Sequence, residues 1–294
     1  MRAKKQSNSL TDAKAALLAA AHDLREDHPG CGVEKIYDTL APCWVGRDKC
    51  CQLLMEAGFR LKRRINYRRT TYSVRTHYKN LIEGMLLTGK NQVWQSDITY
   101  IRVTGKWYYL VFIIDVYTKV IIGYCASNNM RAEANIKALN MAVKSQSPNS
   151  LQRLVHHSDR GSQYHDHQYI QMLNDSKISI SMCVKGRDNA YAERVNGIIK
   201  NEYLNLKYIN SLHELKRELK SSIQHYNSSR IHRSLPGNIT PKQFENDIVN
   251  LTTQERPKVI VHTDGYPNLK AASSRIEVDP GIDLQAPVCP MVYN

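Results

Sequence analysis

Apolar positions between residues 92 and 127 follow the pattern of β-strands. The segment "QVWQSDITYIRV" (92–103) alternates apolar and polar residues and is rich in β-branched side chains, which indicates a half-buried strand. "WYYLVFIIDV" (107–116) is a nearly continuous apolar run, typical of a buried strand, and "KVIIGYCAS" (119–127) predicts a third strand. The connections between them are short, with "TGK" (104–106) as a turn. We therefore expect an antiparallel meander.

Helical spacing and strand patterns alternate from residue 131 onward. Further strands are expected at 151–158 and 178–182, and helices at 131–145, 165–174, 189–204 and 211–226. This order favours an α/β fold in which a mixed five-stranded sheet is flanked by helices. In the tail, residues 251–294, only "KVIVHT" has a strand-like pattern, and the sequence assigns this tail no role.

The first 60 residues have a different, all-helical pattern. Helices are expected at 11–27, 33–40 and 47–57, with Thr11 as an N-cap and Gly58 directly after the third helix. Three short helices joined by tight turns are typical of a small helix-turn-helix-like DNA-binding subdomain, although a plain three-helix bundle fits the same pattern. The predicted division is therefore a helical unit (1–60), a basic linker (61–90), a catalytic core (91–250) and the tail.

The charge of the chain favours a polyanionic partner. The net charge is +14; residues 1–90 contain 17 basic against 9 acidic residues, and residues 91–250 contain 20 against 13. Eight Lys or Arg and no acid lie between Glu56 and Glu83, with tyrosines interleaved. A solvated linker is the ordinary explanation of such a run, but the acid-free bias and the aromatic residues favour contact with a nucleic-acid backbone. The candidate DNA-contacting residues here are Arg63, Arg64, Arg68 and Arg69.

Three acidic residues occupy positions suited to catalysis. Asp97 lies inside the first predicted strand, Asp159 directly follows the fourth, and Glu193 lies on the helix predicted over 189–204. A carboxylate among apolar strand residues is unfavourable unless something pairs with it. If the two strands are neighbours and the helix packs beside them, the carboxylates converge into a site of hard oxygen ligands for Mg²⁺ or Mn²⁺. Two such ions can hold the attacking and leaving oxygens of a phosphodiester.

The positions of other acidic residues, and of two histidines, have simpler explanations than catalysis. Asp115 lies next to a tight turn, where Asp is common, and Asp188 is a candidate N-cap for the following helix. Glu202 lies nine residues after Glu193 and should point to the opposite side of that helix. His156 and His157 are best explained as buried or hydrogen-bonded residues at a strand end.

The helix predicted over 189–204 carries a polar stripe. At 100° per residue, Asn189, Glu193, Asn196 and Lys200 share one side. A solvated polar side would account for this stripe by itself. With a metal site at Glu193, Lys200 would lie about 10 Å further along the axis, within reach of a DNA phosphate.

Neither a membrane segment nor a disulfide framework is expected. No run of 18 apolar residues occurs, and the basic start "MRAKKQSNSL" has no apolar stretch of a secretory signal. The seven Cys residues are odd in number and scattered, as in reduced thiols of a cytoplasm.

Four motifs in order, "VWQSDITYI", "HHSDRGSQY", "GRDNAYAERVNGIIKNEYL" and "YNSSRIHRSLPGNITPKQFE", resemble the OrfB-type DDE transposases of bacterial insertion sequences. The resemblance covers roughly residues 30–250. It departs from the common pattern in "KGRDNA", which is about two residues shorter than usual before the Glu helix.

This resemblance implies an RNase H-like fold with a retroviral-integrase-like catalytic core, two Mg²⁺ or Mn²⁺ ions, and DNA strand cleavage and joining. By this resemblance, the expected catalytic metal ligands are Asp97, Asp159 and Glu193. Lys200 is the expected basic residue two turns after the glutamate. Asn196 and Gln163 are further candidates for DNA contact.

The expected partners are the insertion-sequence ends and target DNA, an upstream OrfA-type protein or fusion, and further copies of the chain on DNA; a membrane is not expected. Two alternatives stay open at this point. The chain could be a non-catalytic DNA-binding regulator derived from a transposase, against which the intact triad argues, or a nuclease of the same fold.

Overall fold

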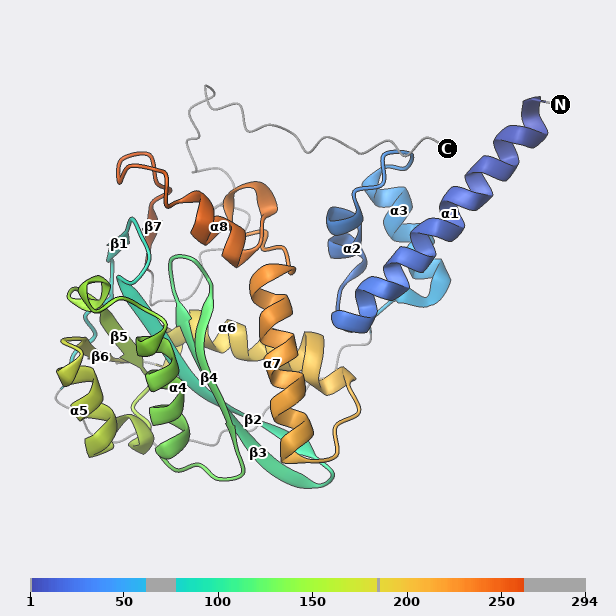
Figure 1. The fold of residues 1–294 in the computed structure, drawn as a ribbon. Coiled ribbons are helices and arrows are strands. Elements are labelled where there is room, and N and C mark those ends of the chain that lie inside the picture. Colours follow the sequence, from blue (N-terminus) through green and yellow to red (C-terminus); the bar gives the residue numbers. More distant parts are fainter. Residues whose placement is uncertain (1, 62–77, 184–185, 262–294) are drawn as a thin grey trace.

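The structure is a computed structural model that describes residues 2–61, 78–183 and 186–261. A small helical unit precedes a larger α/β core, and the two lie side by side (Figure 1). The candidate linker residues Arg63, Arg64, Arg68 and Arg69 lie outside the described residues. Most of the C-terminal tail, 262–294, also lies outside them.

The helical unit consists of α1 (Arg2–Asp27), α2 (Val33–Leu40) and α3 (Arg47–Leu54). The expected start of the first helix with Thr11 as N-cap is wrong, because no Gly or Pro between residues 2 and 10 interrupts the helix. The third helix continues as a π-helical turn, Met55–Phe59, in which Gly58 has a φ of 91°. This left-handed backbone conformation explains the glycine there. Apolar side chains from all three helices form a core of their own: Leu17, Ala21, Ile36, Cys50, Leu54 and Phe59.

The predicted mixed sheet is confirmed. Its strands run in the order β4-β3-β2-β5-β6. Antiparallel pairs join the first three and parallel pairs join β2, β5 and β6. The bounds are β2 (Val93–Val103), β3 (Lys106–Asp115), β4 (Ile121–Ser127), β5 (Val155–Ser158) and β6 (Ser179–Met182). The strand expected over 151–158 begins later than predicted, because Pro148–Leu151 forms a 3₁₀ turn.

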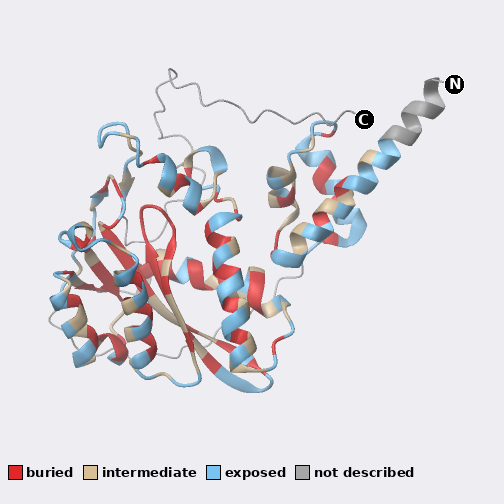
Figure 2. Ribbon diagram, in the orientation of Figure 1, coloured by how far each residue is buried: buried red, intermediate tan, exposed pale blue. Residues whose placement is uncertain are grey.

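Helices cover both faces of this sheet (Figure 1). One buried cluster joins the sheet to α4 (Glu133–Lys144) and α5 (His167–Asp175). Another joins the opposite face to α6 (Ala190–Ile198) and α7 (Leu212–Ser228). Buried residues accordingly concentrate on the strands and on the inward sides of the helices (Figure 2). The helix expected over 189–204 is a continuous run of α6, a π-helical turn (Ile199–Tyr203) and a 3₁₀ turn (Leu204–Leu206).

Parts of the expected linker and tail pack onto the core. The short strand β1 (Leu86–Leu87) pairs antiparallel with β7 (Val259–Ile260), which lies in the strand-like run of the tail. Ile82, Leu87 and Val261 are fully buried, in a cluster that includes Phe244 of α8 (Pro241–Asp247). The packed core therefore extends beyond residues 91–250 at both ends.

Glu202 joins the helical unit to the core. Its carboxylate accepts hydrogen bonds from His28 Nε2 at 2.8 Å and Lys35 Nζ at 2.6 Å, both in the helical unit. It also accepts from Arg230 Nε at 2.8 Å and Nη2 at 3.0 Å, in the core. Burial alone would raise the pKa of Glu202, but the hydrogen bonds from His28 and Arg230 and the nearby positive charges hold it well below its usual range. Glu202 thus lies away from Glu193, as the helical spacing predicted.

The backbones also meet at this contact. Gly30 N donates to Glu202 O at 2.6 Å, and a Cβ at position 30 would lie only 2.2 Å from Glu202 Cα. The ring of His28 stacks on Tyr203, with centroids 4.6 Å apart. A second set of ion pairs joins Arg233 of the core to Glu34 and Asp38 on α2. Acids and bases alternate across the contact, which favours one orientation of the two units.

Two further findings concern the whole described chain. None of the helices in residues 2–61, 78–183 and 186–261 is long and apolar enough to cross a membrane. The six cysteines that the structure describes are all unpaired thiols.

Candidate active site

The register of two parallel strands places Asp97 beside Asp159. Ser96 of β2 pairs with Ser158 of β5, and each aspartate is the next residue along its strand direction. Adjacent strands lie about 4.8 Å apart, so the two carboxyl groups belong to the same edge of the sheet. Both side chains are half-buried. The two strands are therefore neighbours, which is the condition that the sequence set for the carboxylates to converge.

The backbone around Asp159 holds its carboxylate. Gly161 N donates to Asp159 Oδ1 at 3.0 Å, and a Cβ at position 161 would lie 3.0 Å from Asp159 Oδ1 and 3.1 Å from Gln163 Oε1. The glycine in "SDRGSQ" thus allows the loop to fold tightly over the carboxylate.

Helix α6 crosses the same face of β2 and carries Glu193. Asn196, three residues after Glu193, donates from Nδ2 to Asp97 Oδ2 at 2.7 Å. Asn189 donates from Nδ2 to the backbone oxygen of Ser96 at 2.7 Å. Both asparagines are buried, whereas the Glu193 side chain is exposed. The two asparagines of the polar stripe therefore face the sheet, and Asn196 binds one of the carboxylates.

Burial disfavours the ionisation of all three carboxylates, and repulsion between neighbours adds to it for Asp97 and Glu193. Burial raises the pKa of Asp97 well above its usual value, and the nearby Asp159 and Glu193 raise it further. Burial also raises the pKa of Asp159, and burial together with Asp159 raises that of Glu193. Within the described ranges, none of the three forms an ion pair. A cation placed among them would relieve this repulsion.

The donor set has the chemistry of a Mg²⁺ or Mn²⁺ site, because all its ligands are hard oxygens. The buried Asn196 Oδ1, which belongs to the amide bound to Asp97, has no hydrogen-bond partner among the described residues and adds another oxygen. Among the described residues, no group of three His, Cys, Asp or Glu side chains is arranged so that it could hold a metal ion. The exposed Glu193 side chain would therefore have to turn toward the aspartates to complete one.

The candidate DNA-contacting residues lie in different settings. Lys200 is half-buried, with Nζ 5.1 Å from the centre of the Tyr100 ring. Burial lowers the pKa of Lys200 while nearby Asp97 raises it, so the ammonium lies on the side of the carboxylates. Gln163 is buried and its Nε2 donates to Met130 O at 2.9 Å. These contacts lie within the protein, and a DNA-contacting role for Lys200, Asn196 and Gln163 stays a prediction.

Asp115 and Asp188 were among the other acidic residues considered as alternatives to the three candidate metal ligands. The Asp115 carboxylate accepts from the backbone N–H groups of Asn91 at 2.7 Å and Thr118 at 2.8 Å, as expected for a turn residue. The N-cap of α6 is Asn189, one residue after Asp188, so the expectation for Asp188 is wrong by one position.

The two histidines before Asp159 are buried, as expected. His156 Nε2 lies 2.9 Å from Tyr169 Oη, and His157 Nδ1 lies 2.8 Å from Ser181 Oγ. Burial lowers the pKa of His156 to about 3 and that of His157 to about 4. Both are therefore neutral parts of the sheet.

Gln95, which was not predicted from the sequence as part of the site, contacts the start of α6. Its Oε1 accepts from Tyr191 N at 3.1 Å and from Ala192 N at 3.3 Å. The available signal was the strand alternation, which places Gln95 on the same face of β2 as Asp97. An amide there, among apolar neighbours, needs a polar partner when it is buried.

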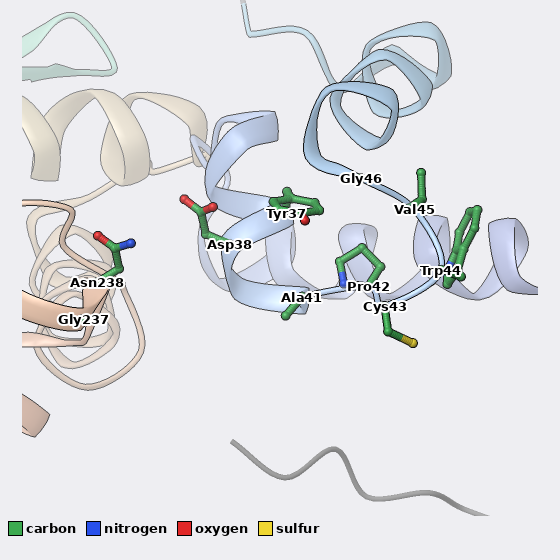
Figure 3. A pocket seen from close by; sticks show the side chains of 10 residues that line it. All are labelled: Tyr37, Asp38, Ala41, Pro42, Cys43, Trp44, Val45, Gly46, Gly237 and Asn238. Atoms are coloured by element: carbon green, nitrogen blue, oxygen red, sulfur yellow. The ribbon is translucent and has the colours of Figure 1, made fainter. Parts of the chain in front are cut away.

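A pocket lies elsewhere, between the α2–α3 connection and the loop at Gly237 and Asn238 (Figure 3). Asp38 and Asn238 come from its two sides, the first from the helical unit and the second from the core. None of the candidate site residues lines it.

Comparisons with known proteins show the family to which the chain belongs. Residues 88–188 and 174–241 match two families that are each described as an integrase core domain, a polynucleotidyl transferase fold. The insertion element IS600 uncharacterized 31 kDa protein of Shigella sonnei is 38% identical over 208 residues, which cover 68% of this chain and 75% of that protein. The chain belongs to the IS3-family insertion-sequence transposases. The family resemblance noted in the sequence is thereby confirmed.

Other members of this transposase family are also similar. Transposase InsF for insertion sequence IS3A of Escherichia coli K12 is 34% identical over 173 residues, covering 57% of this chain and 59% of InsF. The putative transposase InsK for element IS150, from the same organism, is 31% identical over 196 residues and 68% of its length is covered. Among solved structures, the HTLV-2 integrase catalytic core domain in complex with magnesium matches 56% of this chain and 98% of its own, with 19% identity and a TM-score of 0.41.

Proposed function

We propose that the chain catalyses metal-dependent DNA strand cleavage and the joining of a 3′-OH end to target DNA during transposition of an insertion sequence. The observation that carries this proposal is the placement of Asp97 and Asp159 at one edge of the sheet with Glu193 on the facing helix. Their raised pKa values and the lack of ion pairs within the described ranges support a role in cation binding. Relatives named as transposases support the reaction class.

Asp97, Asp159 and Glu193 would hold two Mg²⁺ or Mn²⁺ ions. Bound ions of this kind stabilise the charge that develops on the oxygens of a phosphodiester during in-line displacement. Water or a DNA 3′-OH serves as the nucleophile, so the protein needs no nucleophilic side chain. Asn196 holds one Asp97 oxygen in place through its hydrogen bond, which keeps that carboxylate oriented when the site is loaded.

The chain's own charges would hold the DNA. Lys200 lies about 10 Å along the helical run from Glu193 and on the same side, where it can contact a phosphate flanking the cut. A Cβ at Gly197, between these two residues, would meet no atom within 4 Å, so the helix surface there is open to a DNA backbone. The net charge of +14 adds sequence-independent attraction that weakens with salt.

We further propose that the active assembly contains more than one copy of the chain on DNA, together with an upstream OrfA-type protein or fusion that recognises the element ends. By itself the chain should bind DNA with steep salt dependence and weak sequence preference. Tight, salt-insensitive binding to the element ends by this chain alone would contradict that part of the proposal.

Strand cleavage and joining on labelled DNA carrying the element ends tests the function. The wild-type chain and Glu193→Gln are compared in Mg²⁺ and in EDTA, with and without the upstream partner. Joining that needs the metal and is lost in the variant is the expected result. Cleavage without joining would favour a nuclease. DNA binding with neither reaction, even with the partner, would favour a non-catalytic regulator, and joining by Glu193→Gln would remove Glu193 from the site.

A further inference from the structure

We infer that Gln95 is a positioning residue that sets where Glu193 stands relative to Asp97, an inference that rests on the proposed function. Gln95 precedes Asp97 by two residues on β2, so both side chains project from the same face of the strand. Gln95 is 1% exposed. Its amide is therefore committed to the contacts it makes inside the protein.

Those contacts are with the first turn of α6 and, from Nε2 at 3.4 Å, with the backbone oxygen of Asp188 just before it. The N-cap is Asn189, so Tyr191 and Ala192 are the second and third residues of the helix. Their N–H groups have no acceptor within the helix. Gln95 Oε1 accepts from both, at 3.1 and 3.3 Å. A side chain from the strand thus provides the cap that a helix usually receives from its own N-cap residue.

The N-cap residue itself makes a different bond. The Asn189 side chain makes no capping hydrogen bond and donates instead to the Ser96 backbone oxygen at 2.7 Å. A cap from within the helix would stabilise it but would leave it free to move along the sheet. Here both the cap and the Asn189 amide attach the first turn of α6 to the strand that carries Asp97.

A second attachment lies one turn further along. Asn196 donates to Asp97 Oδ2 at 2.7 Å, and Glu193 lies between the two attachments, directly after Ala192. Loss of the Gln95 cap would let the first turn move while Asn196 still holds the second. Functional side chains must be held within about 0.5 Å of their working geometry, so a small movement of this turn is enough to weaken a shared ligand site.

The chain contains a matched control. Gln92 Oε1 accepts from the backbone N–H groups of Thr88 at 2.7 Å and Gly89 at 3.1 Å. The chemistry is the same, a glutamine oxygen bound to two consecutive N–H groups, but it stabilises the turn before β2. Each amide nitrogen also makes one longer bond, from Gln95 Nε2 to Asp188 O at 3.4 Å and from Gln92 Nε2 to Thr88 Oγ1 at 3.5 Å. Gln92→Met and Gln95→Met therefore each remove a glutamine oxygen bound to two consecutive N–H groups, and only Gln95→Met removes it from the helix of Glu193.

The experiment measures Mn²⁺ affinity by electron paramagnetic resonance, together with strand joining, on the full chain with any partner that the wild type requires. Both Met variants should lower the melting temperature by a few degrees. Only Gln95→Met should weaken Mn²⁺ binding, by about tenfold or more, and lower the joining rate at saturating metal. This difference separates a positioning role from a purely structural one, because both variants lose a glutamine oxygen bound to two backbone N–H groups.

Equal Mn²⁺ affinity and equal joining in Gln95→Met and Gln92→Met would overturn the inference and leave the proposed function intact. Wild-type protein that binds no Mn²⁺, or binds it equally well after Glu193→Gln, would contradict the proposed function and this inference with it. If Gln95→Met does not fold, Gln95→Asn replaces it. Its amide is one carbon too short to reach the helix, so it should show the same loss of Mn²⁺ affinity.

Discussion

Replacing Gly30 by alanine should weaken the contact between the helical unit and the core without unfolding either unit. A Cβ at Gly30 would lie 2.2 Å from Glu202 Cα, whereas ordinary contact begins at 3.4 Å. The backbones must therefore separate by about 1.2 Å. The same movement would lengthen the 2.6 Å bond from Gly30 N to Glu202 O beyond hydrogen-bonding range and stretch the contacts of Glu202 with His28 and Lys35.

The expected cost follows from these losses. A lost backbone hydrogen bond costs about 1 kcal/mol, and an intact hydrogen bond to a charged group contributes about 1.5–3 kcal/mol. Since the charged contacts weaken without all being lost, the contact should lose on the order of 3 kcal/mol. This corresponds to about a 100-fold rise in the population of the separated state.

Hydrogen exchange measured by mass spectrometry tests this prediction. Peptides covering residues 28–40 and 199–206 should exchange about 100-fold faster in Gly30→Ala, whereas peptides from β3 (Lys106–Asp115) should not change. Gly32→Ala is the control, because a Cβ at Gly32 meets nothing within 4 Å and its φ of −70° suits alanine. If Gly30→Ala exchanges like Gly32→Ala, the close approach of the two backbones does not hold the units together.

Three further predictions concern charge. Lys200→Ala should lower the slope of log affinity for DNA against log salt by about 1, measured by fluorescence anisotropy; an unchanged slope would exclude a phosphate contact. His156 and His157 have folded-state pKa values near 3 and 4, below the unfolded value. The unfolded chain therefore binds more protons, and stability should fall as the pH drops below 6.5, by up to about 1.4 kcal/mol per pH unit for each histidine. His157→Gln should flatten this dependence in urea titrations between pH 6.5 and 4, and an equal slope in the variant would contradict it. The pKa of Glu202 is lowered by its partners, so its contribution is complete above the unfolded pKa near 4.5 and is lost as the pH falls further. Glu202→Gln should therefore be less stable than the wild type at pH 7 and lose less stability below pH 4.5; parallel pH curves for the two proteins would refute this.

The sequence by itself determined the secondary structure of the core and the candidate carboxylates. Strand alternation and continuous apolar runs identified β2, β3 and β4 to within two residues, because burial on one or both faces of a sheet leaves a direct pattern in the sequence. An aspartate within a strand, such as Asp97, stands out because burying an unpaired carboxylate is costly. The motif order then identified the family.

Only the tertiary structure decided which distant residues meet. The side chain of Glu202 binds His28, Lys35 and Arg230. No local pattern in the sequence predicts contacts between residues so far apart in the chain. The same holds for Gln95, whose partners lie about a hundred residues further along the chain. The strand pattern showed where Gln95 points, but the side chain's role depends on which helix end lies opposite it. That choice follows from the packing of the whole sheet and its helices, which depends on many weak contacts acting together.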